Sequence, residues 1–300
     1  MQRLNNWIEA FRLRTLFLAL ASVITGGLLP LRVGHFRPGV FVLTLATTIF
    51  LQILSNLAND YGDSEKGTDN DNRVGPLRSV QSGKVSRKEM KRLVIAFVVL
   101  SLITGLLLLY TSFPEERFPE LVLFFFLGIG AIWAAIKYTV GKGAFGYSGL
   151  GDIFVFIFFG MVGVAGSYYL QTLTLDATVF LPALTLGLFS VGVLNLNNMR
   201  DIENDRNHRK HTIPVRLGIR KAKNYHAVLI STGWIAAIFY LALAYCSVFN
   251  FLFFLSLPLF IAHIRKVIKR EGALLDPLLR ELSLSTFLFS VLFAISFLIC

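Results

Sequence analysis

The stretch Leu93-Val-Ile-Ala-Phe-Val-Val-Leu-Ser-Leu-Ile-Thr-Gly-Leu-Leu-Leu-Leu-Tyr110 carries no charged side chain. A helix of about 20 apolar residues is long enough to cross the roughly 30 Å hydrocarbon core of a bilayer. The whole chain has the same character, since 55% of its 300 residues are hydrophobic and only 16% are charged. Soluble domains carry about 25% charged residues. The composition therefore excludes a water-soluble enzyme, a disordered chain and a disulfide scaffold.

Nine apolar runs are long enough to form transmembrane helices. They cover residues 15–33, 39–58, 89–112, 119–138, 151–171, 177–198, 224–246, 248–266 and 282–300. We therefore expect an all-α polytopic membrane protein with nine helices around a central cavity, forming a single domain over residues 1–300. Cys246 and Cys300 lie in apolar runs without metal-ligand spacing, so we expect them to be small buried side chains.

The basic residues are divided very unequally between the two sides of these helices. Of the 29 Lys and Arg residues, only Arg32, Arg37 and Arg117 fall on the side opposite the N-terminus. Because Lys and Arg are enriched in cytoplasmic loops, the sequence predicts a cytoplasmic N-terminus and an outer C-terminus. The net charge of +11 is then mostly a topology signal, and no nucleic-acid partner is needed to explain it.

Two long inner loops each begin with a stripe of Asn and Asp. The first acidic motif covers residues 56–71, and a helix continued through it would place Asn56, Asp60 and Asp63 on one face. The second covers residues 197–205, with Asn197, Asp201 and Asp205 on one face. Hard oxygen ligands suit Mg²⁺, which is commonly shared between carboxylates and phosphates. The alternative is that these acids are solvated and balance nearby basic residues.

Basic side chains crowd both motifs, and they are the groups that hold phosphate oxygens. They are Arg73, Arg78, Lys84, Arg200, Arg206, Arg209, Lys210 and Arg216. The carboxylates could bind a metal ion, and the neighbouring cations could bind an anion. Together they predict a diphosphate substrate.

These motifs resemble those of the UbiA-type intramembrane aromatic prenyltransferases. Asn56-Leu-Ala-Asn59-Asp60-Tyr-Gly-Asp63 most resembles the bacterial members that prenylate 1,4-dihydroxy-2-naphthoate in menaquinone synthesis. Further matching segments run through Arg73–Arg78, Tyr138–Gly141, Tyr147–Asp152, Asn197–Asp201 and Val215–Gly218. The sequence departs from the family pattern at Gly67, where many relatives have Asp, and at Arg209, which replaces a third acid. Asp69 is therefore a further candidate metal ligand.

The resemblance implies transfer of a polyprenyl group from its diphosphate to the naphthoate, with Mg²⁺ as cofactor, in the bacterial cytoplasmic membrane. It implies four roles for residues of this chain. The metal ligands are Asp60, Asp63, Asp201 and Asp205. Substrate contacts come from Asn56, Asn59, Arg78, Tyr147, Asn197, Arg200 and Arg216. Lys142 is a candidate for the diphosphate oxygens, and Asp152 or Tyr138 for polarising the acceptor hydroxyl.

Two other readings remain open. One is prenyl transfer to another aromatic acceptor, and the other is secondary transport of an anionic substrate. Transporters usually place charged groups at the bilayer midplane, whereas here the acids gather at one face. A polyprenyl tail cannot cross water and a diphosphate cannot enter hydrocarbon unpaired. The prenyltransferase reading therefore predicts a lateral opening lined by Phe, Leu and Gly.

Overall fold

The computed structural model describes residues 2–67 and 74–298, so the sequence-predicted ligand Asp69 lies outside the described residues. Within these ranges every regular element is a helix. The elements in chain order are α1 (Gln2–Phe11), η1 (Leu13–Thr15), α2 (Leu16–Leu28), η2 (Leu29–Val33), α3 (Pro38–Lys66), α4 (Arg87–Ser112), η3 (Glu115–Arg117), α5 (Phe118–Lys137), η4 (Phe145–Tyr147), α6 (Gly151–Val155), η5 (Phe156–Gly166), α7 (Ser167–Thr172), η6 (Ala177–Val179), α8 (Phe180–Arg200), α9 (Ile202–Asn207), α10 (Ile213–Leu217), α11 (Ile219–Ala244), η7 (Val248–Ser256), α12 (Leu257–Lys269), η8 (Gly272–Leu275) and α13 (Asp276–Leu298).

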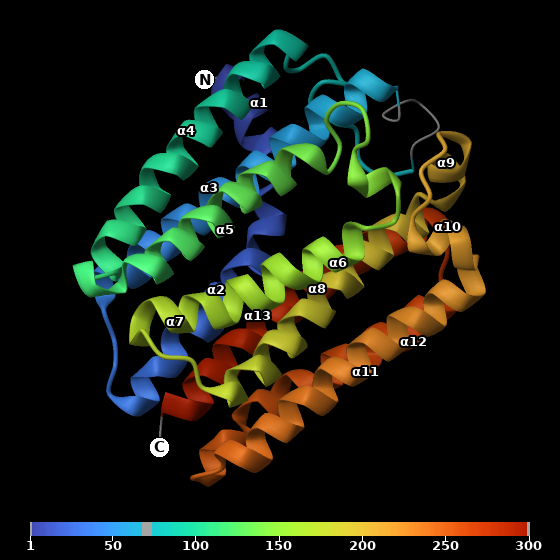
Figure 1. Ribbon diagram of the computed structural model, residues 1–300. Helices are drawn as coiled ribbons and strands as arrows, with labels where there is room; N and C mark the ends of the chain where they lie inside the picture. The colour runs from blue at the N-terminus through green and yellow to red at the C-terminus, as the bar shows by residue number, and fades with distance from the viewer. Residues whose placement is uncertain (1, 68–73, 299–300) are drawn as a thin grey trace.

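Nine helical segments of the described chain are long and apolar enough to cross a membrane, as the sequence predicted. They run over Leu16–Val33, Pro38–Lys66, Arg87–Ser112, Glu115–Lys137, Gly151–Thr172, Ala177–Arg200, Ile219–Ala244, Val248–Lys269 and Gly272–Leu298. Figure 1 shows them as one bundle, with α9 and α10 at one end and the C-terminus at the other. The all-α fold class is thereby confirmed.

Several boundaries differ from the predicted ones. The second span continues as a helix to Lys66 and stops at Gly67, whose φ of 67° is left-handed. Glycine adopts that conformation at little cost, so Gly67 ends the helix at the position where many relatives have Asp. The last helix, α13, begins at Asp276 rather than at 282.

Cys246 differs from its prediction as well. It is exposed after the end of α11, so the expectation of a buried small side chain is wrong for this residue. Cys300 lies outside the described residues.

Two packed regions frame the bundle. One joins α1, α3 and α4 around buried Leu54, Leu57 and Met90. The other joins α8, α11, η7, α12 and α13 around an aromatic core in which Phe189 and Phe289 lie 5.4 Å apart in an edge-to-face arrangement. Such aromatic pairs add to the stabilisation that burial provides, so the last four spans form a solid block.

The cavity lies among the first five spans. It has a volume of about 260 Å³ and is lined by α2, α3, α4, α5 and the α6–α7 segment. Its walls are mostly apolar, and two of its polar residues, Gln52 and Ser55, directly precede the first acidic motif in α3. The predicted cavity is therefore present, and it occupies one half of the bundle.

Helix α5 forms a thin wall of this cavity. Only 6% of its apolar stretch is buried inside the protein, whereas the stretch in α8 is 56% buried. The lining residues Leu106 and Ile129 are at the same time exposed. Exposed lining residues on α4 and α5 are what a cavity that opens sideways to lipid requires.

Close backbone contact holds the opposite wall. The segment η5 is a π-helix, and the carbonyl oxygen of Val164 points at Gly26 of α2 so closely that a β-carbon on Gly26 would lie 2.1 Å from it. Small residues permit such close approach between membrane helices. Gly160 does the same against Ala183 of α8. These contacts fix α2, η5 and α8 together.

We therefore expect Gly26→Ala to destabilise the fold by about 1–3 kcal/mol, because the added methyl group collides with backbone that cannot rotate away. Gly39→Ala is the matched control, since nothing lies within 4 Å of its β-carbon position. Thermal unfolding in detergent measures both. Equal melting temperatures for the two variants would contradict the close contact.

Candidate functional site

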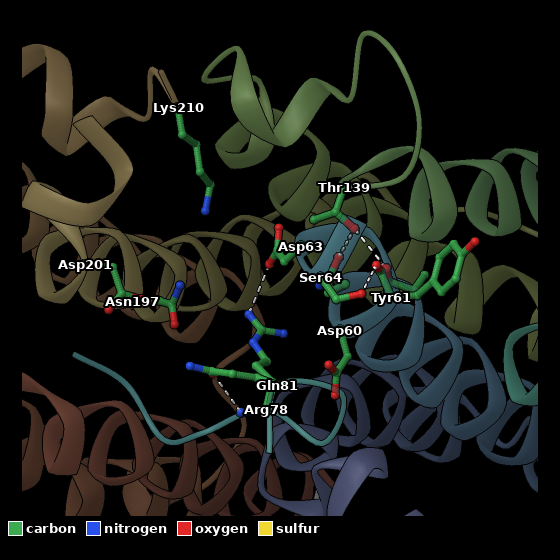
Figure 2. Close-up of polar contacts among 12 residues, drawn as sticks. Asp60, Tyr61, Asp63, Ser64, Arg78, Gln81, Thr139, Asn197, Asp201 and Lys210 are labelled. Carbon is green, nitrogen blue, oxygen red and sulfur yellow. Dashed lines mark hydrogen bonds and ion pairs between the residues drawn. The ribbon is translucent and has the colours of Figure 1, made fainter. Parts of the chain in front are cut away.

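We call the end of the bundle at which the two acidic motifs lie the mouth. Asp63 of the first motif faces the mouth from the last turns of α3. Its Oδ2 lies 3.3 Å from Arg78 Nη2, and its Oδ1 accepts a hydrogen bond of 2.8 Å from the Tyr147 hydroxyl. Figure 2 shows Asp63 and Arg78 directed toward each other across the mouth. The helix that the sequence predicted through this motif thus presents Asp63 to a cation.

Asp60 makes different contacts from Asp63 in this structure. Its carboxylate accepts the backbone N–H groups of Ser79 (3.1 Å) and Val80 (3.4 Å), and its side chain is almost fully buried. In Figure 2 it points away from Asp201. Asp60 therefore anchors the loop that carries Arg78, and the two acids of the first motif do not converge.

The two Asn residues of the first motif also face packed neighbours. The Asn56 amide donates to Phe11 O and to Thr15 Oγ1, both at 2.8 Å, and so holds the N-terminal segment. The Asn59 side-chain oxygen accepts from Thr139 Oγ1 at 3.2 Å. Asn59 thus lies where the end of α5 crosses α3.

The second motif begins at the end of α8. Arg200 donates to both oxygens of Asp201, at 3.0 and 2.6 Å, and to Asn197 Oδ1 at 2.9 Å. It also pairs with Asp276 at the start of α13. The sequence analysis missed Asp276 because it placed the last span too late. Arg200 is therefore shared between two carboxylates and lies buried in the mouth.

Asp205 is the most deeply buried acid of the second motif, with 2% of its surface exposed. Its Oδ1 lies 3.3 Å from Lys210 Nζ, and its Oδ2 is buried with no hydrogen-bond partner among the residues that the structure describes. Burial raises the pKa of Asp205 to about 6, with a further rise from the charges of Asp201 and Asp63 and an opposing effect from Lys210. Tyr147 links the two motifs, because its hydroxyl bonds to Asp63 and its ring lies 5.6 Å from the Lys210 ammonium that pairs with Asp205.

An unusual turn returns Lys210 to Asp205. Arg209 has a φ of 55°, the left-handed conformation that costs a residue with a side chain about 1–3 kcal/mol. The backbone N–H of Lys210 then donates to Asp205 O at 2.8 Å.

Tyr147 stands between the two motifs. The Lys66 ammonium lies 3.9 Å from the centre of its ring and the Lys210 ammonium 5.6 Å from it. Cations are attracted to the faces of aromatic rings. The sequence analysis did not identify Lys66, because only the folded loops bring Tyr147 to it.

Two of the predicted basic contacts lie at the rim of the mouth instead. Arg216 is exposed and donates to Ser148 O (2.7 Å) and His211 O (3.1 Å), which ties the second long inner loop to the connection between α5 and α6. Lys142 is exposed in a glycine-rich turn, and its carbonyl oxygen accepts from Lys137 Nζ at 3.2 Å. Arg78, Arg200 and Lys210 are predicted cations that lie in the mouth.

Tyr138 and Asp152 lie where the mouth meets the cavity. Tyr138 lines the cavity and packs edge-on against Phe145 at 5.4 Å. Burial, opposed by the charge of Lys210 and aided by that of Asp152, raises the pKa of Tyr138 to about 12. Tyr138 is therefore a hydrogen-bond donor at neutral pH. Asp152 is buried and accepts from the Tyr225 hydroxyl at 2.9 Å, a partner that the sequence did not indicate.

The donor set of the mouth suits a hard divalent cation. Asp63, Asp201 and Asp205 supply carboxylate oxygens, and the unpartnered Oδ2 of Asp205 is a buried anion oxygen that a cation would satisfy. Among the described residues, no three acidic, His or Cys side chains are yet grouped as a metal cluster. Each of these acids is paired with a cation of the chain itself.

Comparisons with known proteins find relatives over nearly the whole chain. The chain is 45% identical to the 1,4-dihydroxy-2-naphthoate octaprenyltransferase of Haemophilus influenzae, over 99% of this chain and 97% of that one. It is 42% identical to the enzyme of the same name from Escherichia coli, over 98% of this chain and 96% of that one.

The fold is shared with solved structures. A UbiA homologue from Aeropyrum pernix has a TM-score of 0.69 at 16% identity, over 95% of this chain and 97% of that chain. A homologue from Archaeoglobus fulgidus, solved bound to GPP and Mg²⁺, has a TM-score of 0.56 at 17% identity, over 93% of this chain and 99% of that chain. The model of the UbiA prenyltransferase family matches residues 19–278, and the chain belongs to that family.

Proposed function

We propose that this protein transfers a polyprenyl group from polyprenyl diphosphate to 1,4-dihydroxy-2-naphthoate. The reaction releases diphosphate and CO₂ and gives demethylmenaquinol in menaquinone biosynthesis. One observation carries the proposal. Two acidic motifs, from α3 and α8, meet at a mouth rich in cations that adjoins an apolar cavity. The names and nearly full coverage of the Haemophilus and Escherichia relatives support the naphthoate as acceptor.

The mouth receives the diphosphate and the cavity receives the prenyl tail. Asp63, Asp201 and Asp205 would hold Mg²⁺, with Asp69 as a further ligand. Asp60 keeps the loop of Arg78 in position and would have lone pairs left for the metal. Bound Mg²⁺ neutralises the charge that develops on diphosphate as the allylic C–O bond breaks. Cations already placed near it strengthen the same effect.

The contacts to diphosphate come from the cations and amides of the mouth. Arg78, Arg200 and Lys210 hold its oxygens, and Asn59 and Asn197 border it. Asn56 acts through the N-terminal segment that it holds. Lys142, Arg216 and Tyr147 belong to the loops that cover the mouth, and they close over the bound head group.

The acceptor ring lies where Tyr138 meets the aromatic wall of the cavity. Phe145 and Phe154 are stacked there, with ring centres 4.0 Å apart, and both line the cavity. The Tyr138 hydroxyl donates a hydrogen bond to a hydroxyl of the acceptor and polarises it. Asp152 then accepts the proton of that acceptor hydroxyl. The ring then forms a C–C bond to the allylic carbon and loses its carboxylate as CO₂. Water, which would capture the allylic cation, is excluded by the apolar walls.

The transport reading receives no support from the cavity. Its lining, as far as the described residues define it, contains no charged side chain. A carrier for an anion needs polar groups along its path through the membrane.

We also propose that residues 1–300 act as one domain in the bacterial cytoplasmic membrane, with the N-terminus and both motifs inside. A reporter phosphatase that is active only outside the cytoplasm tests this orientation. Fusion at the C-terminus should be active and fusion after Gly218 inactive. The reverse pattern would place the diphosphate site on the wrong side of the membrane for a cytoplasmic substrate.

The activity has a direct test. Purified protein, Mg²⁺, octaprenyl diphosphate and 1,4-dihydroxy-2-naphthoate should yield the prenylated naphthalenediol and one CO₂ per diphosphate, measured by mass spectrometry and CO₂ release. A single-ring hydroxybenzoate offered instead should be a poor acceptor. Product from the hydroxybenzoate alone would overturn the naphthoate assignment while leaving prenyl transfer standing.

Metal dependence makes a second test. Asp201→Asn and Asp205→Asn should each lower kcat/KM by at least about 100-fold, because each removes an anionic oxygen of nearly unchanged size. Glu203→Gln is the matched control, since Glu203 lies in the same motif but is exposed and pairs with Arg206 at the surface. EDTA should abolish wild-type turnover, and Mg²⁺ should restore it. Turnover that persists in excess EDTA would exclude the metal.

A further inference from the structure

Each of the three acids that face the mouth is already occupied by a cation of this chain. Arg78 lies 3.3 Å from Asp63, Arg200 lies 2.6 Å from Asp201, and Lys210 lies 3.3 Å from Asp205. The three cations are also the ones best positioned to hold diphosphate. In the absence of substrate, the carboxylates that would bind the metal are therefore paired with the cations that would bind the diphosphate.

These ion pairs are buried. Asp205 is 2% exposed and Lys210 is 8% exposed, and the side chains of the other two pairs are at most 10% exposed. Removing one partner from a buried pair strands an uncompensated charge, which is strongly unfavourable. A metal ion alone would displace the cations and strand them, and diphosphate alone would strand the acids. Metal and diphosphate together satisfy both sets.

Lys210 is the member best placed to change partners. Its ammonium has the ring face of Tyr147 within 5.6 Å, and that ring also receives Lys66 on the first motif. The partner that it would leave, Asp205, has one oxygen bound to it and one buried oxygen with no hydrogen-bond partner in the described part of the chain. The Oδ2 of Asp205 is thus available to a metal ion, whereas Lys210 occupies the Oδ1.

We propose that Lys210 is a latch that makes metal and diphosphate binding mutually dependent. Without substrate Lys210 occupies Asp205, and with substrate it exchanges the carboxylate for a diphosphate oxygen as the metal takes its place. This rests on the proposed function. By linkage, diphosphate then tightens metal binding by the same factor by which the metal tightens diphosphate binding.

The test measures binding of Mn²⁺ alone, as a spectroscopic substitute for Mg²⁺, by electron paramagnetic resonance on the purified full chain without diphosphate. Lys210→Met should bind Mn²⁺ more tightly than wild type, by about 5- to 150-fold, because the competing cation is gone. The measurement is made at alkaline pH, so that Asp205 stays ionised without its partner. Lys210→Arg, which keeps the charge, should bind Mn²⁺ like wild type.

Lys221→Met is the control for charge. Lys221 is exposed at the start of α11, and its loss removes one positive charge without touching the acids. It should leave Mn²⁺ affinity unchanged. Should Lys210→Met fail to fold, as judged by its melting temperature, Arg78→Met tests the same exchange at Asp63.

An outcome in which Lys210→Met binds bare Mn²⁺ no more tightly than wild type overturns the latch, since a simple diphosphate contact would behave that way. Inorganic diphosphate, corrected for its binding of Mn²⁺ in solution, should tighten Mn²⁺ binding to wild type more than to Lys210→Met. The two proposals fail separately. If wild type forms the prenylated product but the variant shows no gain in Mn²⁺ affinity, only the latch is wrong.

Discussion

Charged groups at the edge of a hydrocarbon layer need partners, because an isolated ion there is far more costly than one in water. The mouth of this bundle satisfies that requirement entirely from its own chain. Asp63, Asp201 and Asp205 are each paired with an Arg or Lys, and Asp60 is satisfied by backbone N–H groups. The inner loops are held in place largely by these pairs, so the same contacts that allow the acids to be buried also organise the site.

The two halves of the bundle differ in structure and in the role we assign to them. Spans packed around the aromatic core of α8, α11, η7, α12 and α13 form a rigid block, and the acids of the second motif project from it. Spans one to five enclose the cavity, with α5 as a thin and mostly unburied wall. A long apolar substrate needs a wall that can be passed from the side, whereas the charged site needs fixed geometry. Each half meets one of these needs.

The nine spans and the two Asn/Asp stripes could be predicted from the sequence because each depends on local pattern. Apolar length specifies a membrane helix, and helical periodicity places Asn, Asp and Asp on one face. Predictions of which side chains lie together in the folded protein were less accurate. The sequence suggested Asp60 as an equal of Asp63, yet the two point to different neighbours. It also suggested Arg216 and Lys142 as contacts of the mouth, whereas both lie at its rim in this structure.

What the sequence by itself determined is the class of the protein, its topology signal and the chemical character of its site, because these follow from composition and spacing. Tertiary structure decided which charges meet. Asp276 reaches Arg200, Tyr225 reaches Asp152, and Lys66 and Lys210 share the ring of Tyr147. Residues so distant in the chain are brought together only when helices pack and loops close, and no local pattern encodes that pairing. A hydrogen bond or ion pair forms only between atoms a few ångströms apart in space, whatever their separation along the chain.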